Sequence, residues 1–311
     1  MTNKSQFKYY IQLCLALLLW AGLYHVAKPA AEASDPYLVA FLRYLISASL
    51  LLIILRVKEG YWLPVLNRKQ WLLIFCIGAL GICAYNIMFF SAEALISGNV
   101  VAILYSFTPC LTTIISSFVF KTKLNWLSKI GIVIAMFGSI GVVNYATPTC
   151  GQFFCSDILH VVGKGEIYGI LATLIFACYS VLSRYTSQQN VSALVMNAYA
   201  AIFGCLLLGS TSLVRSDFSI IPQLHFSFWL ALIYISVLAT VVAYLWYTSA
   251  IINLGVFKTV VFQNSIPFQT VLIGYVFFSE KIGLGELICG AIVIGGVYIT
   301  NFALSYRRGT S

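Results

Sequence analysis

Charged residues are scarce in this chain. Asp, Glu, Lys and Arg make up 9% of its 311 residues, whereas hydrophobic residues make up 61%. A soluble globular domain carries about 25% charged residues, so this composition does not suit a water-soluble enzyme or binding protein. The sequence therefore predicts a polytopic membrane protein that has the lipid bilayer as its surroundings.

Motifs for cofactor, metal or nucleophile chemistry are missing as well. We find no zinc-ligand spacing, no glycine-rich phosphate loop and no nucleophile elbow, and the three histidines, His25, His160 and His225, are scattered. A membrane-embedded enzyme would need several such groups facing one another. We expect no cofactor, no metal and no enzymatic activity, and we keep the membrane-embedded enzyme only as the alternative of another class.

The positive net charge does not indicate nucleic-acid binding. The formal net charge is +9, but the basic residues lie in short segments beside apolar runs rather than on one face of a soluble domain. With the N-terminus inside, the basic residues of the first half fall on the cytoplasmic side and Lys28 stands alone outside. The bias is weak in the second half. We predict a multi-pass protein of the bacterial inner membrane with both termini cytoplasmic.

Ten apolar runs have the length of a membrane-spanning helix, about 20 residues. The first run is not followed by a cleavage site of small residues, which favours a retained helix over a cleaved signal peptide. The ten runs fall near 9–28, 36–56, 70–92, 97–120, 126–146, 165–184, 191–213, 226–250, 256–278 and 284–304.

The second half of the chain repeats the first. Ser91 to Lys123 align with Ser249 to Lys281 at an offset of 158, which pairs Pro109 with Pro267. Each copy holds five runs, and an odd number forces the second copy to enter the membrane in the opposite orientation. Internal duplication of this kind is typical of transporters.

The predicted fold is all-α, with ten transmembrane helices arranged as two inverted five-helix repeats. The first repeat occupies residues 1–147 and the second occupies residues 165–311. A periplasmic connection at 148–164 joins them.

Three segments carry a family resemblance. They are LLLWAGLYHVAK in the first run, ISGNVVAILYSFTP in the fourth and VFQNSIPFQTVLIGYVFF in the ninth. In their order and spacing the chain resembles bacterial drug/metabolite transporters of the EamA type. The resemblance implies alternating access, a pathway surrounded by helices one, three, four, six, eight and nine, and export as the favoured direction. The chain departs from the family at Lys121 to Lys123, where Gly-Glu is usual, so the resemblance does not identify a substrate.

The two prolines mark one part of a candidate substrate site. A proline within a span leaves a backbone carbonyl without its helical donor, and in a bilayer that carbonyl needs a partner. Polar side chains surround both positions, including Gln263 and Asn264 near Pro267. Lining of a cavity is the favoured interpretation, and the alternative is a packing kink in which Ser and Thr bond their own backbone.

Aromatic residues near the middle of the spans supply the walls of the same candidate site, because rings offer area and hydroxyls offer orientation. The expected substrate-binding residues are Trp20, Tyr24, Tyr85, Tyr105, Pro109, Tyr179, Tyr247, Gln263, Asn264 and Pro267.

Ionisable residues within the spans are few. Arg43 can snorkel outward or pair with Glu93, and His25 lies toward the outer end of the first span. These three are the candidates for coupling or gating. No carboxylate falls at the centre of a span, which favours facilitated passage or loosely coupled exchange, while His25 and Glu93 leave proton antiport open.

Two cysteines stand apart from the other seven. Cys150 and Cys155 fall in the periplasmic connection, where the compartment would permit a disulfide around the intervening loop. Free thiols are an equal alternative.

These features predict a secondary transporter that exports small amphipathic metabolites such as amino acids. An alternative substrate class is a larger, nucleoside-like or adenosyl metabolite, taken up or exchanged. The expected partners are a small-molecule substrate and the lipid bilayer, and a monomer is the simplest form of the protein.

Overall fold

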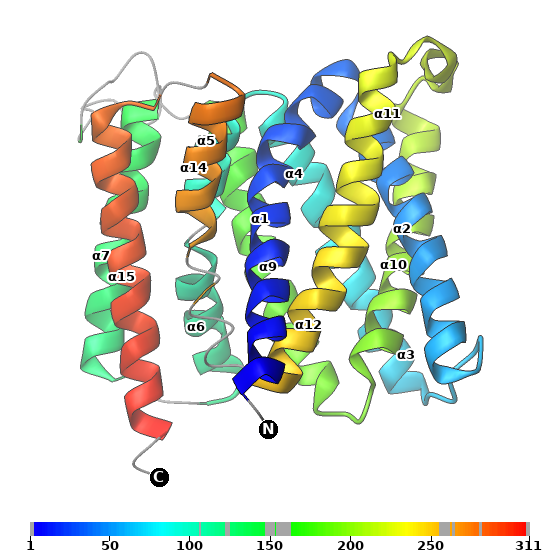
Figure 1. Ribbon diagram of the computed structural model, residues 1–311, viewed down its shortest axis with the longest axis horizontal. Helices are drawn as coiled ribbons and strands as arrows, with labels where there is room; N and C mark the ends of the chain where they lie inside the picture. Colours follow the sequence, from blue (N-terminus) through cyan, green and yellow to red (C-terminus); the bar gives the residue numbers. More distant parts are fainter. Residues whose placement is uncertain are drawn as a thin grey trace.

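The computed structural model describes residues 3–105, 107–121, 125–146, 153, 163–254, 262, 265–279 and 282–308. All regular structure within these residues is helical, and the helices run side by side as a bundle (Figure 1). Among the residues described, seven helices are long and apolar enough to cross a membrane, and the shorter apolar helices Trp126–Val142 and Leu284–Thr300 accompany them.

The first half contributes seven helical elements and one π-helix within the third span. They are α1 (Asn3–Ala33), α2 (Pro36–Glu59), α3 (Arg68–Ile77), the π-helix η1 (Gly78–Ala84), α4 (Tyr85–Glu93), α5 (Gly98–Tyr105), α6 (Thr108–Val119) and α7 (Trp126–Ala146).

The second half follows the same order. It comprises α9 (Lys164–Ser187), α10 (Ala193–Arg215), a short 3-10 helix η2 (Phe218–Gln223), α11 (Phe226–Ile233), the π-helix η3 (Tyr234–Val242), α12 (Ala243–Leu254), α14 (Ile266–Phe277) and α15 (Leu284–Arg308).

Helix boundaries recur at a nearly constant offset between the two halves. α6 and α14 both have 12 residues, and α14 begins and ends 158 positions after α6. α11 and α15 likewise begin 158 positions after α3 and α7. The repeat seen in the sequence is therefore also a repeat of secondary structure.

The residues before several helices explain where those helices begin. The Asp35 side chain accepts hydrogen bonds from the backbone N–H groups of Tyr37 and Leu38, and Pro36 occupies the first turn of α2. Ser192 caps α10 in the equivalent place by accepting from Val195 N–H. Such caps satisfy backbone donors that a helix start leaves open.

Corresponding helices of the two halves pack against each other. α2 contacts α10, and α7 contacts α15, and in both pairs the two helices run in opposite directions (Figure 1). α1 packs on α12, and α9 packs on α4. Because α9 is the counterpart of α1 and α12 is the counterpart of α4, these two contacts are equivalent. α1 begins and α15 ends at the same end of the bundle (Figure 1).

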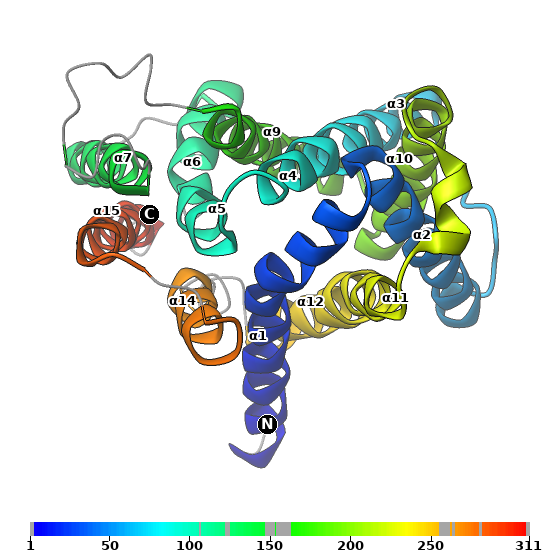
Figure 2. The same ribbon diagram turned by 90° about the horizontal axis from the view of Figure 1, so that it is seen from above.

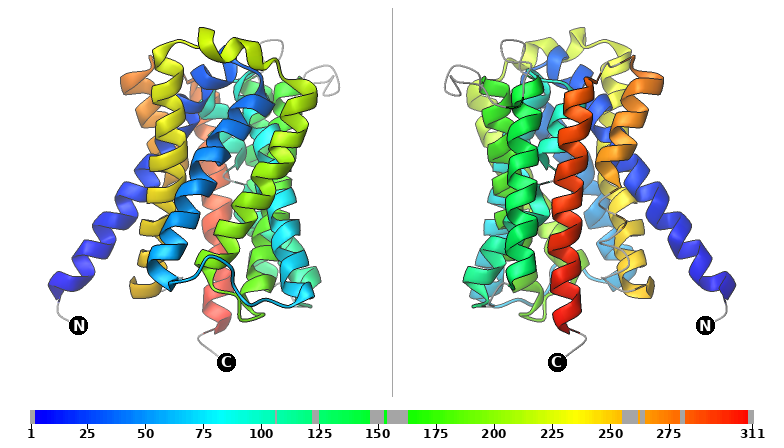
Figure 3. Two further views of the ribbon diagram at one scale, coloured as in Figure 1. Left: turned by 90° about the vertical axis from the view of Figure 1, so that its right-hand side faces the viewer. Right: turned by 90° about the vertical axis from the view of Figure 1, so that its left-hand side faces the viewer.

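The α7–α15 pair lies at one side of the bundle. Seen from above, it is next to α5, α6 and α14, whereas α2, α3, α10 and α11 occupy the opposite side (Figure 2). α1 leans outward toward its beginning (Figure 3). The largest buried apolar cluster joins the first four spans to α9, α10, α11 and α12, and separate smaller clusters hold α7 and α15.

Two described helices, α5 (Gly98–Tyr105) and α6 (Thr108–Val119), fall within the apolar run near 97–120. Pro109 has no N–H to donate to the carbonyl of Tyr105, and the Thr108 hydroxyl donates to that oxygen instead, at 2.6 Å. The freed carbonyl thus has a local partner.

Candidate functional site

Six aromatic side chains from four helices meet inside the bundle. They are Tyr24 of α1, Tyr85 and Phe89 of α4, Tyr105 of α5, and Phe176 and Tyr179 of α9. We call these six residues the aromatic cluster.

Tyr105 and Phe176 lie at the centre of the aromatic cluster. The Tyr105 ring centroid is 5.0 Å from that of Phe176, 6.0 Å from Tyr85 and 6.2 Å from Tyr24. Phe176 is also 5.2 Å from Tyr85 and 5.1 Å from Tyr179. These separations are in the range of attractive, tilted aromatic pairs.

The members of the aromatic cluster are buried to different degrees. Tyr24 and Tyr85 are buried, with exposed fractions of 4% and 9%. Tyr105, Phe176 and Tyr179 are partly buried, and their rings pack against rings of neighbouring helices. Aromatic rings are the usual walls of a small-molecule site.

A second aromatic pair lies on the same face of α1. The Trp20 ring centroid is 4.9 Å from that of Tyr247 in α12, and the Trp20 indole N–H donates to the carbonyl oxygen of Ala239 at 2.9 Å. Trp20 and Tyr24 are four residues apart, so their side chains leave α1 on one face. Four expected wall residues, Tyr24, Tyr85, Tyr105 and Tyr179, thus lie in the aromatic cluster, and Trp20, on the same face of α1 as Tyr24, forms a separate pair with Tyr247.

Phe176 belongs to the aromatic cluster although it was not among the expected substrate-binding residues. The signal was available, because Ala16 to Lys28 align with Ala172 to Arg184 at an offset of 156, which pairs Trp20 with Phe176. The Phe176 ring contacts the rings of both Tyr85 and Tyr105 and so connects α9 to α4 and α5.

The prolines occupy the start of two helices, as far as the structure describes them. Pro109 and Pro267 are each the second residue of their helix, α6 and α14. The side chains of both prolines, and the residues Gln263 and Asn264, lie outside the described residues. Their contribution to the site stays a prediction.

Arg43 is a buried charge with polar partners on two other elements. Its guanidinium donates to the Asn86 side-chain oxygen at 2.9 Å and to the Thr240 hydroxyl at 2.9 and 3.2 Å. The side chain is 5% exposed, so it does not snorkel outward. These bonds join α2 to α4 and η3. The pairing of Arg43 with Glu93 stays a prediction.

Both π-helices offer carbonyl oxygens to side chains. In η3, Ser236 accepts from the Ser47 hydroxyl at 3.0 Å, and Ala239 accepts from Trp20. In η1, Ile82 accepts from the Asn86 side chain at 2.8 Å. Wide helical turns of this type often occur at functional sites, and the sequence analysis did not foresee them.

The other two candidates for coupling or gating are fully enclosed. His25 is 1% exposed, and its Nε2 lies 2.7 Å from the carbonyl oxygen of Thr270 in α14. Its ring stacks on Phe278, with a centroid distance of 5.0 Å and an interplanar angle of 21°. Glu93 is 0% exposed at the end of α4.

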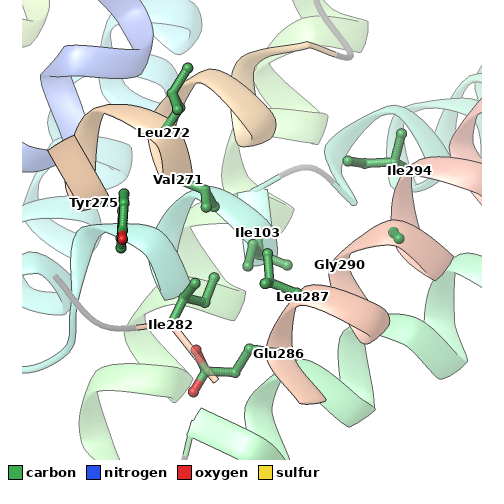
Figure 4. Close-up of a pocket in the computed structure, with 10 residues that line it drawn as sticks. Ile103, Val271, Leu272, Tyr275, Ile282, Glu286, Leu287, Gly290 and Ile294 are labelled. Carbon is green, nitrogen blue, oxygen red and sulfur yellow. The ribbon is translucent and has the colours of Figure 1, made fainter. Parts of the chain in front are cut away.

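A separate cavity of about 690 Å³ opens between α14 and α15 (Figure 4). Aliphatic side chains form most of its lining, with Tyr275 and Glu286 as its polar groups. Ile103 of α5 borders it, whereas Tyr105 belongs to the aromatic cluster. Two residues apart, these side chains leave α5 on nearly opposite faces, so α5 separates the cavity from the aromatic cluster.

Cys150 and Cys155 lie outside the described residues, so their disulfide stays a prediction. Across the described part of the chain, no three His, Cys, Asp or Glu side chains lie close enough to hold a metal ion.

Comparisons with known proteins agree on one class. The chain is 25% identical to the uncharacterized transporter YetK of Bacillus subtilis, over 96% of this chain and 88% of that protein. It is 26% identical to the uncharacterized transporter YyaM of the same organism, over 93% and 92%. An uncharacterized transporter of Archaeoglobus fulgidus shares 25% identity over 94% and 97%.

The fold is shared with a protein of known structure. A crystal structure that is 21% identical in sequence superposes with a TM-score of 0.63, over 98% of this chain and 99% of that one. The profile of the EamA-like transporter family matches residues 7–144 and again residues 163–302. The chain therefore belongs to the EamA-like transporter family, and it is a multi-pass membrane transporter.

Proposed function

We propose that the protein is a secondary transporter that exports small amphipathic metabolites, such as amino acids, by alternating access, and that it is not an enzyme. The substrate binds against the aromatic cluster. The observation that carries this proposal is the cluster itself, in which α1, α4 and α5 of the first half and α9 of the second half meet around partly exposed rings.

The chemistry of the aromatic cluster suits an amphipathic molecule. Rings of Phe89 and Phe176 present only apolar surface, while the tyrosines also carry hydroxyl groups that can orient a polar substituent. Glu93 lies at the end of α4, the helix that carries Tyr85 and Phe89, and Arg43 of α2 bonds Asn86 of the same helix. Sites of this composition bind small molecules through contact with apolar surface, and a few polar groups fix the orientation of the molecule.

The proposed architecture is ten transmembrane helices in two inverted repeats. The recurring helix boundaries support it, as does the antiparallel packing of α2 on α10 and of α7 on α15. Two related halves of opposite orientation enclose a site at the membrane midplane and rock around it. A monomer supplies both halves, so one chain suffices for the cycle.

The proposed topology places both termini in the cytoplasm of a bacterial cell, with Cys150 and Cys155 in the periplasm. After reduction, variants that keep one of these cysteines as their single cysteine should react with an impermeant thiol reagent in intact cells. The control is a variant with a single cysteine in place of Ser187, at the end of α9 that this topology places inside. Reaction of Cys150 or Cys155 only after lysis would reverse the orientation.

The proposed transport needs no imposed proton gradient. This follows from the sequence, in which no carboxylate falls at the centre of a span. Purified protein in liposomes should exchange labelled for unlabelled amino acid at equal pH on both sides. A growth screen of a deletion strain against toxic amino acids and their analogues selects the compound to use.

Two results separate the parts of this proposal. Exchange that requires a pH difference and disappears in Glu93→Gln or His25→Gln would show that protons are coupled through those residues. Exchange of a nucleoside-like compound, with none of any amino acid, would replace the substrate class but keep the transport function.

A further inference from the structure

Two phenylalanines occupy equivalent positions at opposite ends of the bundle. Phe120 follows the last residue of α6 and Phe278 follows the last residue of α14, and they are 158 positions apart. α6 ends at the same end of the bundle as α15, whereas α14 ends at the other (Figure 1). Each phenylalanine therefore lies toward one membrane face.

Each phenylalanine is in contact with the first helix of the other half. The ring of Phe278 stacks on His25 of α1, at 5.0 Å. The guanidinium carbon of Arg184 in α9 lies over the ring of Phe120, 4.8 Å from its centroid. α14 corresponds to α6, and α1 corresponds to α9. The contact between α1 and α14 therefore has its counterpart in the contact between α9 and α6, although the two contacts differ in chemistry.

The backbone beyond both phenylalanines is unusual in the same way. Lys121 has a φ of 52° and Ser279 has a φ of 53°, and neither residue is a glycine. A left-handed conformation is costly for such residues and persists where the surrounding structure requires it. In both copies the left-handed residue comes directly after the phenylalanine, so the phenylalanine caps the end of its helix.

We propose that Phe120 and Phe278 are the two gate residues of the transport cycle. Arg184 holds the first and His25 holds the second. The cycle releases one contact while the other stays closed, because release of both would open a continuous path and release of neither would prevent transport. This inference rests on the proposed alternating access and adds the residues that control it.

The two contacts differ in their surroundings. His25 is buried and also bonds Thr270 in α14, whereas Arg184 is exposed. Phe278 is itself 42% exposed, and Phe120 is partly buried. The contact at Phe278 is thus anchored by a buried histidine, and the contact at Phe120 by an exposed arginine.

The test measures access to the middle of the protein from each face. A single cysteine in place of Tyr105 reports it, in a variant without the native cysteines, through reaction with an impermeant maleimide in intact cells and in inverted membrane vesicles. Phe278→Ala should increase labelling from the face where α14 ends by about fivefold, the shift produced by loss of a contact of about 1 kcal/mol. Phe120→Ala should increase labelling from the opposite face.

Matched controls are the adjacent residues Phe277→Ala and Val119→Ala, which are 77% and 52% exposed and should leave both rates unchanged. Arg184→Gln should act like Phe120→Ala, and Arg184→Lys, which keeps a cation, should act less. The proposal is wrong if both phenylalanine variants raise labelling from the same face, or if neither changes it in protein made at the normal level.

The labelling test uses no substrate, so its outcome is separate from that of the transport assay. Opposite shifts in labelling without exchange of any tested compound would support the gates and leave the substrate class open. Exchange without opposite shifts would support transport and overturn the gates.

Discussion

Tyr105→Ala is expected to weaken substrate affinity by about 0.5–3 kcal/mol, the range of typical point substitutions, which is up to about a hundredfold. The ring contacts Tyr24, Tyr85 and Phe176, and its loss removes both a wall of the proposed site and the support of its neighbours. The KM for counterflow in liposomes should rise, because substrate binding is weaker.

A matched control is available in the helix that follows. Phe118→Ala in α6 also replaces a ring by a methyl group, but Phe118 is 78% exposed and lies outside the aromatic cluster. It should leave the KM unchanged. Equal KM values for Tyr105→Ala and the wild type, at equal expression, would remove the aromatic cluster from the pathway.

Gly296→Ala is expected to lower the stability of the protein by about 1–3 kcal/mol or more. A Cβ at this position would lie 2.6 Å from the carbonyl oxygen of Gly131 and 2.9 Å from Cα of Ala135, both in α7. Because these atoms belong to the backbone, no side chain can move aside, and α7 and α15 must separate. Close backbone approach through small residues is a common way for membrane helices to associate.

The adjacent glycine provides the control for this prediction. A Cβ at Gly295 would meet no atom within 4 Å, so Gly295→Ala should match the wild type. Thermal unfolding of the purified protein in detergent compares the two variants. If Gly296→Ala unfolds at the wild-type temperature, α7 and α15 do not pack as closely as described.

The all-helical membrane fold follows from the sequence because it depends on long apolar runs. The repeat visible in the residues also recurs in the secondary structure, since α14 begins 158 positions after α6. Membership in a transporter family could be predicted for the same reason, because resemblance extends over the whole chain.

Other features depend on contacts between distant residues and were not predictable. The π-helices η1 and η3 have no separate sequence pattern, because the wider helical turn depends on the hydrogen-bond partner that each backbone carbonyl finds in the folded protein. The partners of Arg43 are 43 and 197 residues away along the chain. An apolar pattern shows that such an arginine needs partners but not which ones.

The hydrogen bonding before Pro109 is local. The carbonyl of Tyr105 accepts from the Thr108 hydroxyl, which is the kind of contact that the packing alternative expected of Ser and Thr. The lining of a substrate cavity by Pro109 and Pro267 stays a prediction.

The measurement that tests the central claim most directly is substrate protection of a cysteine placed in the aromatic cluster. Tyr179→Cys, in a variant without native cysteines, is labelled with a small maleimide at increasing concentrations of the transported compound. The account predicts that labelling slows as the site fills, while a cysteine in place of Leu206, which is 62% exposed, reacts at a constant rate. Equal labelling rates of the Tyr179→Cys variant with and without a compound that the same preparation transports would contradict it.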